Sequence, residues 1–209
     1  SQEPWIPWEM CQLLGQRDGR TVEGRFFGEA FEVTRWLLET SIKTDLHLKN
    51  MALVVQKYGG TSVATIAKIE NVAQKVIRAK ESGNQVVVVL SAMAGETDRL
   101  IGLAHQVSDD PDGREYDALI STGEQVTVTL LAMMLNKLGH KAKSLLGYQA
   151  KILTDQSYTN ARILSISNKT IKNELKNGNI VVVAGVQGVD SENNITTLGR
   201  GGSDTSAVA

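Results

Sequence analysis

Two runs of apolar, mostly β-branched residues restrict the folds open to this chain more than any other feature of its sequence. Residues 86–90 (VVVVL) and 180–184 (IVVVA) carry no polar side chain. Such runs are typical of parallel strands that helices cover on both faces. They predict an α/β fold with a mainly parallel sheet, in which ligands bind at the loops that follow the carboxyl ends of the strands.

Helices are predicted between these strands. Between residues 63 and 82, apolar side chains recur with the spacing of one helix face, and Thr61 or Ser62 is the expected N-cap and Gly83 the expected end. The remaining pattern predicts strands at 53–56, 142–146 and 161–166, helices at 99–107, 115–138 (broken near 121–123) and 169–176, and a turn-rich hairpin after residue 184.

The composition changes abruptly at Met51. Every Trp, every Phe and the single cysteine, Cys11, precede this residue, and no repeating strand–helix pattern does. We therefore predict that Met51 is the natural start of the protein. Residues 1–50 are then an extension or an extraneous segment of unknown structure, and residues 51–209 form the domain.

Charge and cysteine content exclude several classes of protein. The formal net charge of −1 gives no broad attraction to nucleic acid or to an anionic membrane. One cysteine cannot form an intrachain disulfide framework and suits a reducing compartment. Because we find no signal peptide and no apolar run long enough to span a bilayer, we expect a cytoplasmic protein. The three histidines are scattered, so no protein metal site is expected.

A glycine turn follows the first predicted strand, at residues 57–62 (KYGGTS). Gly59 and Gly60 allow a tight turn with exposed peptide N–H groups, the next helix N-terminus adds donors, and Lys57 adds a positive charge. These features suit a polyphosphate, although a strand-to-helix turn without a ligand uses the same residues. The turn matches neither the P-loop nor the dinucleotide-binding fingerprint.

A second glycine loop, residues 198–205 (LGRGGSDT), places three glycines around Arg200. A guanidinium group binds a carboxylate or phosphate through two parallel hydrogen bonds. Ser203 and Asp204 are a capping pair for a following helix, and Asp204 is alternatively suited to hold a nearby lysine. A flexible linker is disfavoured, because a strand and a hairpin lead into the loop.

Two other loops carry polar residues of interest. Thr97 and Asp98 follow the strand at 86–90, where either residue would cap the next helix or line a site. Glu124 lies in the broken helical region and suits the ammonium group of a ligand. Taken alone, Glu124 is more typical of a solvated helical acid.

In combination, these motifs resemble the bacterial aspartate kinases of the amino acid kinase family. The resemblance rests on KYGGTSV (57–63), SAM (91–93) with TD (97–98), STGEQ (121–125) and TLGRGGSDT (197–205), in this order. It covers residues 51–209 and none of residues 1–50. It implies a three-layer αβα sandwich, the amino acid kinase fold, truncated at the C-terminus, with the rest of the catalytic domain and regulatory ACT domains outside this chain.

The resemblance also implies roles for individual residues. Lys57 would contact the transferring phosphoryl group and Asp204 would organise that lysine, while the glycines cradle the ATP phosphates. Arg200 would bind the α-carboxylate of aspartate, and Glu124 its α-ammonium group. The implied phosphate-binding residues are Lys57, Tyr58, Gly59 and Gly60, and the implied substrate-binding residues are Thr97, Glu124, Arg200, Gly201, Gly202 and Ser203.

The implied reaction is phosphorylation of the L-aspartate side-chain carboxylate by ATP with Mg²⁺, giving 4-phospho-L-aspartate. This is the first step of the lysine, threonine and methionine branch of biosynthesis. The full-length protein is expected to be a homo-oligomer, and the present chain alone to be inactive. The alternatives are a sibling kinase acting on acetylglutamate, glutamate or a nucleoside monophosphate, a nucleotide-binding oxidoreductase, and a non-catalytic interaction module.

Overall fold

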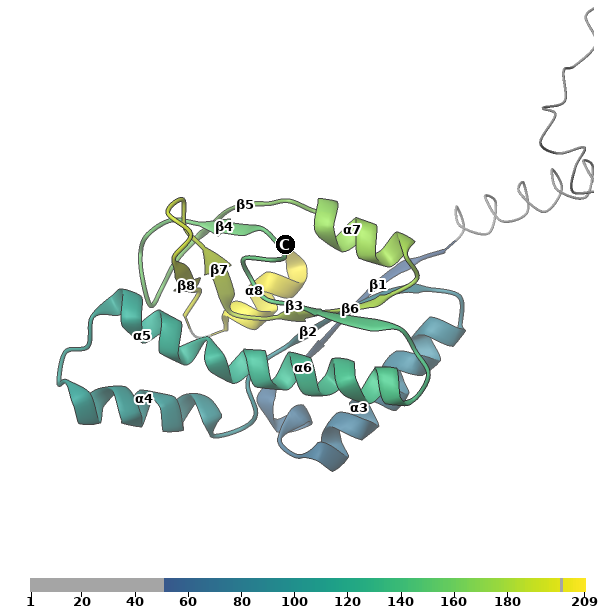
Figure 1. Cartoon of the computed structure of the whole chain (residues 1–209), viewed down its shortest axis with the longest axis horizontal. Coiled ribbons are helices and arrows are strands. Elements are labelled where there is room, and N and C mark those ends of the chain that lie inside the picture. Colours follow the sequence, from purple (N-terminus) through teal and green to yellow (C-terminus); the bar gives the residue numbers. More distant parts are fainter. Residues whose placement is uncertain (1–50, 200) are drawn as a thin grey trace, which may run out of the picture. The chain divides into compact units, whose positions relative to one another are not determined.

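Four parallel strands form a central sheet in the order β1-β2-β6-β3. The computed structural model describes residues 51–199 and 201–209 (Figure 1). All of β6 is buried, as is β2 after its first residue, which agrees with the two apolar runs. The four strands are β1 (Leu53–Tyr58), β2 (Gln85–Leu90), β6 (Ile180–Ala184) and β3 (Ala142–Leu145).

Helices lie on both faces of this sheet (Figure 1). Ile69 of α3 and Leu131 of α6 pack with Val182 of β6 in one core cluster. Val181, the preceding residue of β6, packs with Leu175 of α7 in a second cluster on the opposite face. The predicted α/β fold with a parallel sheet is confirmed. The helices are α3 (Ile66–Glu81), α4 (Glu96–Val107), α5 (Gly113–Ile120), α6 (Thr122–Lys137), α7 (Lys169–Lys176) and α8 (Gly202–Val208).

A smaller second sheet has the order β5-β4-β7-β8 and is mostly antiparallel. The β7–β8 hairpin is the predicted turn-rich hairpin. Strand β4 was not predicted, because three residues are too few to show an alternating pattern. The strands are β4 (Ile152–Thr154), β5 (Ile163–Ile166), β7 (Gln187–Val189) and β8 (Ile195–Thr197).

The first helix begins later than predicted. A 3₁₀ turn, η1 (Gly60–Val63), follows β1, and α3 starts only at Ile66. The side chain of Thr65 caps α3 by accepting a hydrogen bond from the Lys68 N–H at 3.3 Å. The prediction of Thr61 or Ser62 as the cap is therefore wrong. The glycine turn therefore leads into a 3₁₀ turn, which begins at Gly60, rather than directly into an α-helix.

The predicted break in the long helical region is confirmed at Ser121, between α5 and α6. By length and composition, the combined stretch Gly113–Lys137 would suit a membrane span, but half of its apolar 18-residue window is buried inside the protein. Val128, Leu131 and Leu135 of α6 are completely buried in the core beside the parallel sheet. Its apolar character therefore matches that of a helix in a protein core.

Candidate active site

Lys57 and Asp204 form an ion pair between two distant parts of the sequence. The Nζ atom of Lys57, in β1, lies 2.8 Å from Oδ1 of Asp204, in the first turn of α8. Gly201 is the N-cap of α8 and no side chain caps this helix, so the predicted Ser203–Asp204 capping pair is wrong. Of the two roles considered for Asp204, the structure places it against the lysine.

The first glycine turn packs against the loop that follows β2. A Cβ atom on Gly60 would lie 2.6 Å from the carbonyl oxygen of Ala92, so only glycine fits there. The Ala94 N–H donates to the Gly60 carbonyl at 3.2 Å and holds the two loops together. At Gly59, a Cβ atom would be 3.8 Å from the Lys57 ammonium nitrogen. The turn and the lysine charge therefore share one small region.

Tyr58 lies between the lysine and the glycines, but its side chain is directed elsewhere. The ring packs against the main hydrophobic core. Its hydroxyl donates to Oε1 of Gln56 at 3.1 Å. A contribution of Tyr58 to phosphate binding would therefore have to come from its backbone.

Ser91 and Ala92, directly after β2, join the remaining motifs. The Ser91 hydroxyl donates to the Ser203 hydroxyl at 3.0 Å, which ties the loop to α8. The Ala92 N–H donates to Oε1 of Glu124 at 3.1 Å, which ties the same loop to α6. Gly185, after β6, completes the junction, because a Cβ atom there would lie 2.7 Å from Cβ of Ser203. The loops after β1, β2 and β6 thus meet the start of α8 and the first turn of α6.

Glu124 is buried at this junction, with only 4% of the residue exposed. Burial raises the pKa of the Glu124 carboxyl from 4.5 to about 7, although the hydrogen bond from the Ala92 N–H acts in the opposite direction. The interpretation of Glu124 as a solvated helical acid is therefore wrong. A buried carboxylate at a strand-end junction is suited to receive a cationic group of a ligand.

The second glycine loop approaches the same junction. Gly199 and Gly201 adopt φ angles of 71° and 81°, a conformation that other residues rarely tolerate. A Cβ atom on Gly202 would lie 2.6 Å from Cβ of Leu198, so the turn closes tightly on itself. Arg200 lies outside the described residues, and its predicted role stays a prediction.

Thr97 is a half-buried residue in the first turn of α4. This helix begins at Glu96, and Gly95 is its N-cap with a φ angle of 83°. The prediction that Thr97 or Asp98 caps the helix is therefore wrong. The predicted place of Thr97 in a substrate site stays a prediction.

Two polar residues of this site, Ser91 and Gln187, and one near it, Asp117, were not assigned a role from the sequence. Ser91 contacts Ser203, and its position directly after a buried strand was the available signal. Gln187 donates from Nε2 to the Ser121 carbonyl at 2.6 Å and acts to lower the pKa of Glu124. Asp117 of α5 is completely buried. No pattern in the sequence distinguishes Gln187 or Asp117 from a surface residue.

No group of three or more His, Cys, Asp or Glu side chains in residues 51–199 and 201–209 has an arrangement that would hold a metal ion. The carboxylates of the site are accounted for by other contacts. Asp204 pairs with Lys57, and Glu124 accepts the Ala92 N–H.

Comparison with known proteins gives consistent matches. The sequence model of the amino acid kinase family matches residues 52–209. An aspartokinase of Pseudomonas aeruginosa is 60% identical over 159 residues, which are 76% of this chain and 39% of that protein. The present chain therefore spans about two fifths of the length of this relative.

Solved structures give the same result for the fold. The aspartate kinase from Synechocystis is 46% identical with a TM-score of 0.64, over 75% of this chain and 25% of that one. The E. coli aspartokinase III in complex with aspartate and ADP has a TM-score of 0.61 over 73% of this chain and 44% of that one. At 22% identity, the latter supports the fold alone.

Proposed function

Because this chain belongs to the amino acid kinase family, we propose that the full-length protein containing it is an aspartate kinase. It transfers the γ-phosphoryl group of ATP to the side-chain carboxylate of L-aspartate. The observation that carries this proposal is the junction at Ser91 and Ala92, where the Lys57 turn, the Ser203 helix and the Glu124 helix meet. The 60% identity to an aspartokinase supports the same activity.

Lys57 is the cation assigned to the phosphoryl group in transit. Its ion pair with Asp204 fixes the ammonium group beside the glycine turn. Gly59 and Gly60 have no side chains, so their backbone N–H groups can approach the phosphates closely. Mg²⁺ arrives as part of the ATP complex, bound mainly by phosphate oxygens and water. Together these charges offset the repulsion between a carboxylate and a triphosphate.

The acceptor amino acid has one cationic and one extra anionic group, and the proposal assigns a partner to each. Glu124 receives the α-ammonium group, and this cation would also compensate the buried carboxylate. The α-carboxylate is assigned to Arg200 with the backbone of Gly201 and Gly202. Ser203 and Thr97 line the remaining part of the site.

The reaction itself needs no general base, because the nucleophile is already an anion. A side-chain carboxylate oxygen attacks the γ-phosphorus, and a new C–O–P bond forms. The bond from this phosphorus to the bridging oxygen breaks, and ADP leaves with the added negative charge. The products are 4-phospho-L-aspartate and ADP. E. coli aspartokinase III is described in complex with aspartate and ADP, which are one substrate and one product of this step.

We further propose that the product enters the lysine, threonine and methionine branch of biosynthesis. We also propose a cytoplasmic location and a homo-oligomeric full-length protein. Because the chain covers 39% of the aspartokinase it matches, we propose that the 209 residues alone are catalytically inactive.

The sibling kinases differ in the acceptor, and Glu124 discriminates among them. N-Acetylglutamate has no ammonium group, so it would leave the buried Glu124 carboxylate without a cationic partner. Glutamate keeps the ammonium group, but its extra methylene displaces the reacting carboxylate from Lys57. An oxidoreductase is disfavoured, because the turn after β1 lacks the dinucleotide-binding fingerprint.

The decisive experiment is an assay of the full-length protein with ATP, Mg²⁺ and a panel of L-aspartate, L-glutamate and N-acetylglutamate, trapping the acyl phosphate with hydroxylamine. We expect hydroxamate from aspartate at a rate well above that from the other acceptors. The Lys57→Ala variant should lower kcat by about 10²- to 10³-fold, because a preorganised charge at the transition state is lost.

Lys143→Ala is the matched control, since this lysine also lies on a strand of the parallel sheet and pairs with Glu174 at 2.6 Å. We expect it to retain wild-type turnover. Equal activity of wild type and Lys57→Ala would contradict the proposed role of Lys57. A preference for another acceptor, or NADH-binding without kinase activity, would overturn the aspartate kinase assignment.

A further inference from the structure

Asp117 is a completely buried carboxylate whose hydrogen bonds, among the described residues, go to Thr159 and Thr197 rather than to the residues assigned above. It projects from α5 and accepts hydrogen bonds from two separate segments. The Thr197 N–H and the Thr197 hydroxyl donate to it, each at 2.7 Å. The Thr159 N–H lies 3.0 Å from both carboxylate oxygens. Burial raises the pKa of Asp117, while the bonds from Thr197 and Thr159 act to lower it.

These partners lie at the entrance of the second glycine loop. Thr197 is the last residue of β8, two residues before Gly199. Thr159 adopts a φ angle of 68°, which is unusual for a β-branched residue and is held by the bond to Asp117. A Cβ atom on Gly199 would lie 3.2 Å from the Thr159 carbonyl oxygen. The carboxylate thus fixes both the strand that leads into the loop and the segment packed against it.

Asp117 is also coupled through the chain to Glu124. It lies one turn before the break at Ser121, and the Ser121 N–H bonds to the Asp117 carbonyl at 3.0 Å. Glu124 follows in the first turn of α6. The Asp117 backbone therefore belongs to the helical segment that carries Glu124, whereas its side chain holds the segment that leads into the Gly199–Ser203 loop.

We propose that Asp117 is a positioning residue that sets the separation between Glu124 and the Gly199–Ser203 loop, and hence the fit of the acceptor amino acid. This inference rests on the proposed function, because the two elements are those assigned to the α-ammonium and α-carboxylate groups. ATP contacts the Lys57 turn, which Asp117 does not touch. Loss of this carboxylate therefore weakens the use of aspartate more than the use of ATP.

The test uses Asp117→Asn in the full-length protein, a change that keeps the shape but turns an amide N–H₂ toward the N–H donors. We expect the KM for L-aspartate to rise about tenfold or more, because small displacements of positioning groups have effects of this size. The KM for ATP should change less than twofold. Thr197→Val loses the hydroxyl donor to Asp117, so we expect a smaller rise in the KM for L-aspartate. Thr197→Ser keeps a hydroxyl, and its KM for L-aspartate should stay close to the wild-type value.

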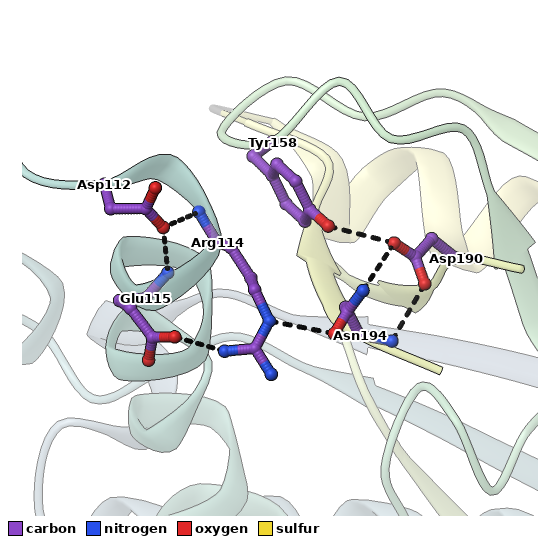
Figure 2. A network of polar contacts seen from close by, with 6 residues as sticks. All are labelled: Asp112, Arg114, Glu115, Tyr158, Asp190 and Asn194. Atoms are coloured by element: carbon purple, nitrogen blue, oxygen red, sulfur yellow. Dashed lines mark hydrogen bonds and ion pairs between the residues drawn. The ribbon is translucent and has the colours of Figure 1, made fainter. Parts of the chain in front are cut away.

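Asp190→Asn is the matched control for a general loss of stability. Asp190 is also buried, at 2% exposure, and accepts bonds from Tyr158 and Asn194 at the β7–β8 hairpin (Figure 2). The hairpin network extends to Arg114 through Asn194 (Figure 2). We expect Asp190→Asn to lower the melting temperature. It should not raise the KM for L-aspartate more than the KM for ATP.

A second readout does not depend on activity. Amide hydrogen exchange of the segment 196–205 should be faster in Asp117→Asn than in wild type, and unchanged in Asp190→Asn. If wild type forms no aspartyl phosphate, the proposed function fails, and exchange still tests whether Asp117 holds the loop. If wild type is active but Asp117→Asn changes the KM for L-aspartate and the KM for ATP equally, the positioning role is overturned. It is also overturned if Asp190→Asn raises the KM for L-aspartate selectively, as Asp117→Asn is expected to do.

Discussion

A buried carboxylate such as Glu124 destabilises a folded protein when it is ionised and has no cationic partner. Its pKa rises from 4.5 to about 7 on folding, so the folded state binds more protons than the unfolded state between these two pH values. Stability must then fall as the pH rises through this window. A bound α-ammonium group would remove part of this cost.

The Glu124→Gln variant should abolish this pH dependence, because a glutamine side chain does not titrate, while removing the site for the ammonium group. Between pH 5 and pH 8, we expect the free energy of unfolding of wild type to fall by about 2 to 3 kcal/mol relative to the variant. Urea denaturation at both pH values measures this difference. At pH 8 the variant should be the more stable protein, yet its KM for L-aspartate should rise by about 10²-fold or more, because a charge-assisted bond is lost.

Glu70→Gln provides the comparison for this experiment. Glu70 is an exposed residue of α3, so its replacement removes a carboxylate that folding leaves in water. Its pH profile and its KM for aspartate should match those of wild type. Parallel stability profiles of Glu124→Gln and wild type would show that the carboxylate is not buried as the structure describes.

The burial of Glu124 could not be predicted from the sequence, for a physical reason. Apolar residues lie on all sides of α6, since Leu131 is buried whereas Val126 and Met133 are exposed. The spacing of apolar residues therefore does not define which face of α6 meets the core. Lys57 differs, because its place at the end of a strand and before two glycines made it a candidate for phosphate binding from the sequence alone.

At the level of elements, segments with a clear apolar pattern were predictable, and the three-residue strand β4 was not. The helix at 169–176 and the strand at 180–184 agree with α7 and β6 residue for residue. The three-residue β4 carries too little sequence to show a period. The start of α3 was misplaced because Thr61 and Ser62 were the expected caps, whereas these residues lie in the 3₁₀ turn η1 and Thr65 caps the helix.

Gly185 tests whether the contact between elements matters. Its Cβ would lie 2.7 Å from Cβ of Ser203 and 2.9 Å from the Leu90 carbonyl oxygen, so Gly185→Ala must push α8 away from the strand ends. We expect a loss of about 1 to 3 kcal/mol in stability, and a fall in kcat of about tenfold or more, because the Asp204–Lys57 pair shifts with α8. Thermal melting and the hydroxamate assay measure the two effects.

Gly102→Ala is the corresponding control on α4. A Cβ atom there meets nothing within 4 Å. The substitution should stabilise the helix by about 0.5 to 1 kcal/mol and leave turnover unchanged. If Gly185→Ala behaved like Gly102→Ala, the close packing of α8 against β2 and β6 would be incorrect.

At the scale of the whole domain, the site depends on which strands are neighbours. The carboxyl ends of parallel strands share one edge of the sheet, so the sequence already indicated that several loops would meet. The sequence did not indicate that β2 lies between β1 and β6. This order places Ser91, after β2, between the end of β1, which carries Lys57, and the loop that carries Gly185. Strand order depends on long-range packing in two separate cores, and no local pattern encodes it.

The present chain holds Lys57, Glu124 and Ser203, but it covers only 39% of the aspartokinase it matches at 60% identity. We therefore expect the 209-residue chain to recognise L-aspartate without phosphorylating it. Addition of aspartate should perturb NMR signals of the segment 121–125, and Glu124→Gln should abolish this effect. Hydroxamate formation should stay at background under conditions in which the full-length protein turns over, because the rest of the catalytic domain implied by the resemblance lies outside this chain. Circular dichroism and a cooperative thermal transition must first show that the chain is folded. Measurable aspartyl phosphate from the folded 209 residues would mean that Lys57, the glycine turn and the Glu124 junction are sufficient for catalysis.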